Sequence, residues 1–375
     1  MSELSYLEKL LDGVEVEWKT LGSIAELKRG TSITKKDVID GTIPVVAGGR
    51  TPAYYHNTSN RDGQTIVIAG SGAYAGFVSW WEEPIFVSDA FTVKPHNILL
   101  PRYCYHFLMN MQQQLHDFKS GGGVPHVYPR DVSPILIPIP CPDNPEKSLA
   151  IQSEIVRILD KFTALTAELT AELNMRKKQY NYYRDQLLSF KEGEVEWKTL
   201  GEVAQFKRGT AITQKQTTPG EIPVVANGPI PTYFHSESNR QGETIVIARS
   251  GAYAGYVSFW DQPIFLTDAF SVHSDLKIVK PKFIYHVLQN KQEHIHAMKK
   301  GAGVPHVRVK EFETYDIPIP PITEQDRIVS ILDKFDTLTN SITEGLPREI
   351  ELRQKQYEYY RDLLFSFPKP ETVSK

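Results

Sequence analysis

The stretch EVEWKTLG at Glu15–Gly22 occurs a second time at Glu194–Gly201, an offset of 179 residues. The same offset aligns Trp18–Val93 with Trp197–Val272 without a gap, and 48 of these 76 positions are identical. The match resumes at two later motifs: GGGVPHV against GAGVPHV, at Gly121–Val127 and Gly301–Val307, and IPIP, at Ile137–Pro140 and Ile317–Pro320. Chance does not produce identity of this extent, so one globular domain is present twice.

Each copy is expected to mix helices and strands. The segments Thr65–Trp81 and Thr244–Trp260 predict two strands around a Gly-rich turn, because β-branched residues flank a segment with several glycines. Arg102–Phe118 and Lys282–Met298 have the apolar spacing of amphipathic helices, and a proline precedes each, as at many helix starts. The expected fold class is therefore α+β, with two mixed α/β domains and a pseudo-two-fold internal repeat.

A long helix is predicted after each globular copy. In the first, about Ser148–Phe190, apolar residues recur at alternating intervals of four and three, as in a coiled coil. This seam comprises Ile151, Ile155, Ile158, Phe162, Leu165, Leu169, Leu173, Tyr180, Tyr183, Leu187 and Phe190. The second helix begins near Thr323, should break at Ile342–Pro347, where Gly and Pro occur together, and then continues to Phe367. An antiparallel coiled coil separating the domains is expected; the alternative is that each helix packs on its own domain.

The predicted boundaries follow from these patterns. A first domain occupies residues 1–145, with a short N-terminal helical segment, and a central spacer helix occupies 146–192. The second domain spans 193–321, and the C-terminal helix and tail span 322–375. The N-terminal Tyr6–Trp18 resembles the junction between the first helix and the second domain. Bringing the two chain ends together would therefore complete an approximate two-fold arrangement.

Charge is distributed unevenly along the chain. The net charge is −3, yet Trp18–Arg130 has 11 Lys/Arg and 8 Asp/Glu, and Trp197–Lys310 has 14 and 8. The two globular segments therefore have net charges of +3 and +6, and the helices are acidic. Basic segments favour a phosphate-bearing partner such as DNA, although the +3 of the first segment alone is within ordinary surface variation. Two cysteines, no signal peptide and no long apolar run favour a cytoplasmic protein.

Motifs for enzyme chemistry are missing from the sequence. There is no HExxH, CxxC pair, GxxxxGK[ST] or GxSxG, and neither a DPPY-like methyltransferase motif nor a nuclease constellation is present. The Gly-rich GSGAYAG and SGAYAG turns, at Gly70–Gly76 and Ser250–Gly255, fit a tight turn or a phosphate contact. No carboxylate or cysteine lies at ligand spacing from His126 or His306, so no metal site is expected.

Basic, polar and aromatic residues in matching loops are the candidates for DNA contact. Lys and Arg bind phosphates, and the side chains of Arg, Asn, Ser and Thr can also read base edges. Aromatic side chains among basic residues are typical of a nucleic-acid groove. The alternative for each is a loop held by its own side chains. In the first copy the candidates are Lys28, Arg29, Thr31, Tyr54, Asn60, Arg61, Ser71, Tyr74 and His126. In the second copy they are Lys207, Arg208, Thr210, Tyr233, Asn239, Arg240, Arg249, Ser250, Tyr253, His306 and Arg308.

The helical motifs carry a family resemblance. ILDKF occurs at Ile158–Phe162 and Ile331–Phe335, and QY-x-YYRD-x-L-x-SF at Gln179–Phe190 and Gln356–Phe367. With the tandem TAELTAEL of Thr166–Leu173, these motifs resemble the specificity subunit of a type I restriction–modification enzyme, IC family, over the whole chain. The recognition domains of such subunits usually differ from each other, whereas here they are near copies.

The resemblance implies a non-catalytic DNA-recognition subunit in which each domain reads half of a bipartite site. It also implies that the helices set the half-site distance and bind two adenine-methyltransferase subunits. The resemblance further implies that restriction subunits join this complex. S-adenosylmethionine, ATP and Mg²⁺ would bind to the partner subunits, and no cofactor would bind to this chain. The alternatives are a free-standing sequence-specific DNA-binding regulator and a scaffold that does not bind DNA.

Overall fold

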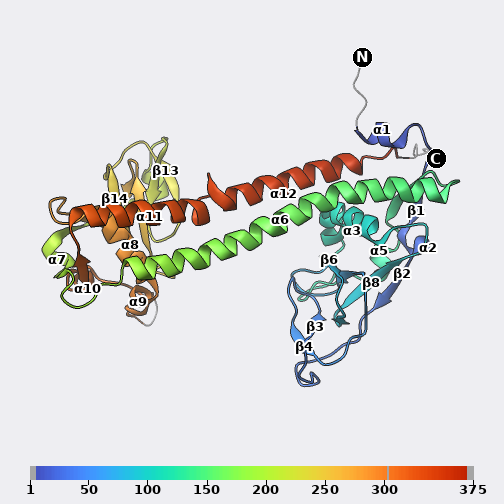
Figure 1. Ribbon diagram of the computed structural model, residues 1–375, viewed down its shortest axis with the longest axis horizontal. Helices are drawn as coiled ribbons and strands as arrows, with labels where there is room; N and C mark the ends of the chain where they lie inside the picture. Colours follow the sequence, from blue (N-terminus) through green and yellow to red (C-terminus); the bar gives the residue numbers. More distant parts are fainter. Residues whose placement is uncertain (1–5, 302–303, 370–375) are drawn as a thin grey trace, which may run out of the picture. The chain divides into compact units, whose positions relative to one another are not determined.

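The computed structural model describes residues 6–301 and 304–369 and divides the chain into two compact units. Unit 1 contains the described residues up to Leu169 and from Ile350 onward, and unit 2 contains Thr170–Glu349. Each unit therefore combines one copy of the repeat with helical segments that lie before and after it in the chain. The long helix α6, Pro145–Leu187, begins in unit 1 and ends in unit 2. Figure 1 shows the elements and their order.

The globular part of unit 1 contains three small sheets. Their strand orders are β2-β8-β5-β6, β4-β3-β7 and β1-β9. Its strands are β1 Val16–Thr20, β2 Ala25–Arg29, β3 Ile43–Val46, β4 Tyr54–His56, β5 Thr65–Ala69, β6 Val78–Trp81, β7 Phe86–Val87, β8 Ala90–Pro95 and β9 Leu136–Pro140. Its short helices are α1 Tyr6–Leu11, α2 Leu21–Ile24, α3 Pro101–Asn110, α4 Gln112–Asp117 and α5 Pro129–Val132.

Unit 2 repeats this topology with the sheets β11-β17-β14-β15, β13-β12-β16 and β10-β18. Its strands are β10 Glu196–Thr199, β11 Ala204–Arg208, β12 Ile222–Val225, β13 Tyr233–His235, β14 Glu243–Ala248, β15 Val257–Asp261, β16 Phe265–Leu266, β17 Ala269–Ser274 and β18 Asp316–Ile319. Its helices are α7 Leu200–Val203, the 3₁₀ turn Gln214–Gln216, α8 Pro281–Asn290, α9 Gln292–Ala297, α10 Val309–Glu313 and α11 Ile322–Asn340. The α+β class and the internal repeat are confirmed.

The central strands form where the sequence predicts them. β5 and β6 pair antiparallel from Thr65–Trp81 to Ile68–Val78, and β14 and β15 repeat this register from Thr244–Trp260. Every residue of β5 is buried, because the sheet is covered on both faces, and this explains its continuous Ile-Val-Ile run.

The predicted helix at Arg102–Phe118 is wrong in one respect, because it is divided in two at Met111. The break lets the Gln112 side chain reach the Gly-rich turn. Its Oε1 accepts a hydrogen bond from the Val78 N–H at 3.0 Å, and its Nε2 donates to the Gly76 carbonyl at 2.8 Å. Unit 2 divides its helix in the same way at Lys291. The break therefore ties the helix pair to the turn between the two strands.

The helical seam begins differently from its prediction. Ile151, Ile155 and Leu159 are the buried apolar residues in the first turns of α6, whereas Ile158 is only half-buried and Leu165 is 37% exposed. Apolar residues at intervals of four form one stripe on the helix, and this stripe packs against the globular core of unit 1 rather than forming a coiled-coil seam. The alternative prediction, that the helix packs on its own domain, is thus right for these turns.

Helix pairing begins further along. In unit 1, α6 lies beside α12, Gly345–Leu364, which runs in the opposite direction, and Phe162 stacks on Tyr360 with ring centroids 5.2 Å apart (Figure 1). In unit 2, Tyr183 of α6 stacks on Phe335 of α11 at 5.7 Å. The predicted break in the second helix is confirmed, because α11 ends at Asn340 and α12 starts at Gly345.

The two ends of the described chain meet in the core of unit 1. Leu7 and Leu11 of α1 share a buried cluster with Leu364, Phe365 and Phe367 from the end of α12. In unit 2 the matching place is taken by the end of α6, where Tyr180 and Leu188 join the core. The expected meeting of the two chain ends is therefore confirmed within unit 1.

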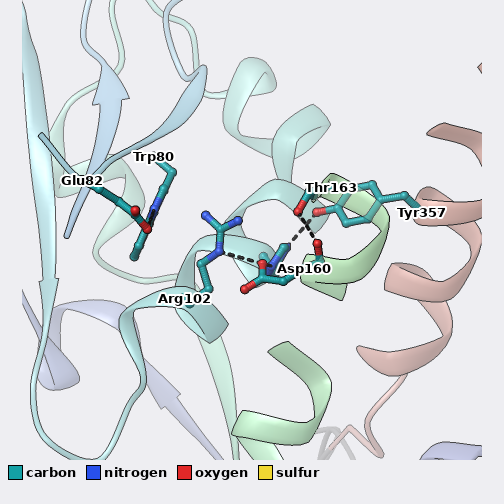
Figure 2. Close-up of polar contacts among 7 residues, drawn as sticks. Trp80, Glu82, Arg102, Asp160, Thr163 and Tyr357 are labelled. Atoms are coloured by element: carbon teal, nitrogen blue, oxygen red, sulfur yellow. Dashed lines mark hydrogen bonds and ion pairs between the residues drawn. The ribbon is translucent and has the colours of Figure 1, made fainter. Parts of the chain in front are cut away.

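A polar cluster around the buried His106 joins the globular part of unit 1 to both of its long helices (Figure 2). His106 of α3 is fully buried; its Nε2 lies 2.7 Å from Asp160 Oδ1 of α6, and its Nδ1 lies 2.9 Å from the Tyr357 hydroxyl of α12. Arg102 donates to the same Asp160 oxygen at 2.8 Å and covers the Trp80 ring. A carboxylate on Nε2 makes that nitrogen the donor, so Nδ1 accepts the Tyr357 proton.

Candidate nucleic-acid interface

A hollow in unit 2 brings several predicted residues together. It has a volume of about 660 Å³ and lies where the end of β11, the turn after β14 and the loop before α10 meet. Its basic lining residues are Arg208, Arg249, Lys300, Arg308 and Lys310, and its acidic one is Glu313. Such an excess of positive side chains around a concave surface attracts an anionic ligand.

Unit 1 has a hollow of about 470 Å³ at the same place in the fold. It is lined by Arg29, Ser71, His126 and Tyr128 among others. Gly70 and Tyr128 occupy the positions of Arg249 and Arg308, so this hollow is less basic than its counterpart. The two units therefore present equivalent surfaces with different side chains.

Backbone bridges hold the His126 loop at the rim of the hollow. The His126 N–H donates to the Ser120 carbonyl at 2.9 Å, and the Gly72 N–H donates to the Pro125 carbonyl at 2.9 Å. The His126 ring then stacks on Tyr128 with centroids 5.7 Å apart and planes 5° from parallel. In unit 2, His306 forms the same bridges, with Ser250 and Lys300. Both predicted histidines thus have a fixed place in the lining of the hollows.

Arginine side chains lie over two tyrosine rings in unit 1. The Arg29 and Arg130 guanidinium carbons are 5.5 Å and 4.8 Å from the Tyr128 ring centroid. Nearby, Arg50 lies 4.9 Å from the centroid of Tyr74, a predicted residue that is 42% exposed. Guanidinium groups stacked on rings keep their edges available for phosphate or base contacts.

Lys300 is already paired within unit 2. Its Nζ lies 2.7 Å from Glu311 Oε1, and the Arg308 N–H donates to the other oxygen at 3.1 Å. Burial would raise the Glu311 pKa, but these hydrogen bonds outweigh it and lower the pKa. Lys300 therefore contributes less free charge to the hollow than its position alone indicates.

The guanidinium groups of Arg61 and Arg240 bond within the fold. Arg61 donates from Nε to Thr92 Oγ1 at 3.1 Å, from Nη1 to the Asn60 carbonyl at 2.7 Å and from Nη2 to the Arg29 carbonyl at 2.9 Å. Arg240 donates to the matching groups of unit 2 at 2.7–2.8 Å, and burial lowers its pKa. Most donors of each guanidinium group are thus occupied, which leaves these two arginines little hydrogen-bonding capacity for DNA.

Asn60 and Asn239 also bond within the fold. The Asn60 amide donates to the Val87 carbonyl at 2.9 Å and accepts from the Val87 N–H at 2.7 Å. Asn239 makes the same two bonds with Leu266 at 2.9 Å and 2.6 Å. Each amide thus bonds to both backbone groups of one residue in a short strand and holds that strand in place.

The other predicted residues lie at different places. Lys28 and Lys207 are exposed but line neither hollow; they neighbour Arg29 and Arg208 on strands whose side chains alternate between faces. The Tyr233 hydroxyl donates to the Ile212 carbonyl at 2.9 Å, which commits it to the fold. The remaining candidates are Tyr54, which is half-buried, and Thr31, Thr210 and Tyr253, which are exposed.

Sequence reasoning missed the lining residues Lys300 and Lys310 of unit 2. The signal was present, because both lie within a few residues of the shared GVPHV motif. Among residues 6–301 and 304–369, no three His, Cys, Asp or Glu side chains gather as metal ligands. In the same described ranges, no helix has the length and apolarity to span a membrane.

Comparison with known proteins yields consistent matches. A family model described as the type I restriction modification DNA specificity domain matches residues 13–176 and 192–352. The specificity subunit of the Escherichia coli type I restriction enzyme EcoR124I/EcoR124II is 45% identical over the whole of both chains. That of EcoprrI, also from Escherichia coli, is 37% identical over 92% of this chain and 93% of its own. The crystal structure of a type I restriction–modification S subunit from M. genitalium covers 96% of this chain and 98% of that chain with a TM-score of 0.71 and 20% identity, which shows a shared fold.

Proposed function

This chain belongs to the family of type I restriction–modification DNA specificity proteins and recognises DNA sequence, and we propose that each unit reads one half of a bipartite site through its hollow. The observation that carries the proposal is the pair of equivalent hollows, one at the same place in each copy of the fold, with basic and aromatic linings. Base edges are read by a few side chains, while phosphate contacts fix the position of the protein.

Binding to DNA under varied salt tests this assignment. Replacing Arg208 and Arg308 with alanine removes two cations from the unit 2 hollow. Each lost phosphate contact should weaken binding on all sequences and lower the salt slope by about 1, whereas a lost base contact should relax one position of the half-site. Lys198→Ala is the control, because it removes one charge from strand β10, away from the hollow. Unchanged affinity and salt slope in the double variant would refute the proposed face.

The chain is proposed to be non-catalytic and to act with two adenine-methyltransferase subunits and with restriction subunits. S-adenosylmethionine, ATP and Mg²⁺ would bind to those partners. The naming of the relatives as specificity subunits supports this division of labour. The test is purification of the chain with its associated proteins, followed by assays of the isolated chain. A copurifying methyltransferase is expected, and methyl transfer by the chain alone would contradict the proposal; a free-standing regulator would instead bind its site with full affinity by itself.

The TAELTAEL segment, Thr166–Leu173, is proposed to set the distance between half-sites, because it lies in α6 between the two domain copies in the sequence. One TAEL unit adds four residues, or roughly 6 Å of helix at about 1.5 Å per residue. DNA rises about 3.4 Å per base pair, so one unit corresponds to one or two base pairs. Mapping methylated sites for variants with one, two and three units should show that change with the half-site bases unaltered; an identical spacing in all three would contradict it.

A further inference from the structure

The two hollows differ most at the turn that follows the central strand. Arg249 and Asn227 occupy this region in unit 2, and the aligned residues in unit 1 are Gly70 and Gly48. Arg249 follows β14 directly and lines the hollow with 43% of its side chain exposed. It is therefore anchored by the strand and open to a ligand.

A network of polar groups contacts both the backbone and the side chain of Arg249. Its backbone N–H and that of Ser250 donate to the Asn227 side-chain oxygen at 3.0 Å and 3.2 Å. Its guanidinium Nη1 lies 3.7 Å from Asp268 Oδ1. The other oxygen of Asp268 accepts a 2.8 Å hydrogen bond from the Ser250 hydroxyl and a further bond from the Asn227 amide. The carboxylate is thus fixed on one side and faces Arg249 with the other.

The aligned turn of unit 1 is built differently. The Gly70 N–H donates to the Asp89 carbonyl at 3.0 Å. A Cβ at Gly48 would overlap with the Ser71 carbonyl oxygen, so an asparagine does not fit there without movement of the turn. In unit 2 the backbone has rearranged, and Asp268 takes a φ of +21°. Asp and Asn tolerate such angles better than most residues.

We infer that Arg249 contacts a guanine in the half-site of unit 2 and that Asp268, held by Asn227 and Ser250, is the residue that positions its guanidinium. This inference rests on the proposed DNA recognition by the hollows. Arginine binds the O6 and N7 of guanine through two parallel donors, and this requires a defined orientation of the guanidinium plane. A neighbouring carboxylate supplies that orientation.

The same carboxylate argues against a phosphate contact for Arg249. A phosphate bound to the guanidinium would lie close to Asp268, and two anions at short range repel each other. The acceptor atoms of guanine are neutral, so they avoid this penalty. The arrangement therefore favours a base over a phosphate, and unit 1, with glycine at this position, lacks the contact.

The experiment is selection of double-stranded DNA from a randomised library by the full chain, purified with any subunits that accompany it. Wild type should prefer guanine about 5- to 150-fold at one position of one half-site. Arg249→Ala should abolish that preference, and Asp268→Asn should weaken the same preference without weakening overall binding. Asparagine suits the backbone angle of this position, so the Asp268 variant keeps the turn. Asp261→Asn, at the end of β15, makes the same charge change outside the hollow and should leave the preference intact.

Two results would overturn the inference while leaving DNA recognition by unit 2 intact. If Arg249→Ala weakens binding evenly on all sequences and lowers the salt slope by about 1, Arg249 contacts a phosphate. If Asp268→Asn strengthens binding evenly and the guanine preference persists, the carboxylate only neutralises charge. Absence of any sequence preference in the wild-type chain would instead count against the proposed function itself.

Discussion

Tyr357→Phe tests how the C-terminal helix is joined to the globular part of unit 1. The change deletes one hydroxyl, which lies 2.9 Å from Nδ1 of the fully buried His106 (Figure 2). The ring remains to pack at 5.9 Å from the imidazole. Unit 2 already shows the resulting state, because Nδ1 of His286, the counterpart of His106, is buried and has no hydrogen-bond partner among the residues that the structure describes. The variant therefore gives unit 1 the polar arrangement of unit 2.

The magnitude follows from the lost bond. Leaving a buried acceptor without its donor costs about 1–2 kcal/mol of unfolding free energy. For a unit of this size, with two chain segments up to Leu169 and from Ile350, each kcal/mol lowers the melting temperature by roughly 2–4 °C, so the expected shift is about 2–8 °C. The loss should be confined to unit 1, since each unit has its own hydrophobic core.

Hydrogen exchange read by mass spectrometry separates the two units, because peptides from α3 and α8 report on each one. Tyr180→Phe is the matched control: Tyr180 occupies the same place in the first QYxYYRD motif, where its ring stacks on Phe335 at 5.9 Å. Faster exchange in α3 for Tyr357→Phe alone is expected. Equal effects of the two variants in their own units, or no effect of either, would refute the reasoning.

Three further predictions concern the fold and the half-sites. Unit 1 should lose stability as pH falls below 6.5, because burial lowers the pKa of His106 and the unfolded chain therefore binds the proton first. Urea titrations from about pH 7.5 to 5.5 should show a decline in the free energy of unfolding, and His106→Gln should reduce that decline. Arg61→Lys should destabilise unit 1 by about 1.5–3 kcal/mol in the same assay, because lysine lacks the fork that spans three acceptors, with base preference in DNA selection unchanged. The two half-sites should share bases, since Arg29/Arg208 and His126/His306 recur in both hollows; methylome sequencing that finds no shared base would contradict this.

The fold was predictable to a large extent, because the chain contains its own comparison. The 179-residue repeat fixed the existence of two like domains, and hydrophobic patterning located β5, β6 and the long helices. The division of the helix at Met111 was not predictable, because nothing in the local pattern opposes continuation. It depends on the Gln112 side chain meeting the Val78 N–H, a contact between segments 34 residues apart.

The candidate site was predictable only in part. Arg29, Ser71 and His126 do meet in one hollow, but Arg61 turns inward, because the carbonyl groups at the end of β2 surround its guanidinium. The local sequence, an arginine after Ser and Asn, is the same whether the arginine binds a DNA phosphate or backbone carbonyl groups of its own chain. Only the position of those carbonyls, set by the pairing of β2 with β8, distinguishes the two.

The comparison of the two copies also shows that some residues of the fold are kept while part of the hollow lining differs. The Asn-Arg pair that bonds to backbone groups is identical in both units, at Asn60–Arg61 and Asn239–Arg240, and makes the same bonds. Residues that differ, such as Gly70 against Arg249, line the hollows. Because a change at the hollow leaves the paired strands and the buried core untouched, its effect on stability should be small while its effect on the base contacted is direct. A domain built in this way can alter the sequence it reads without altering the fold that holds the reading residues in place.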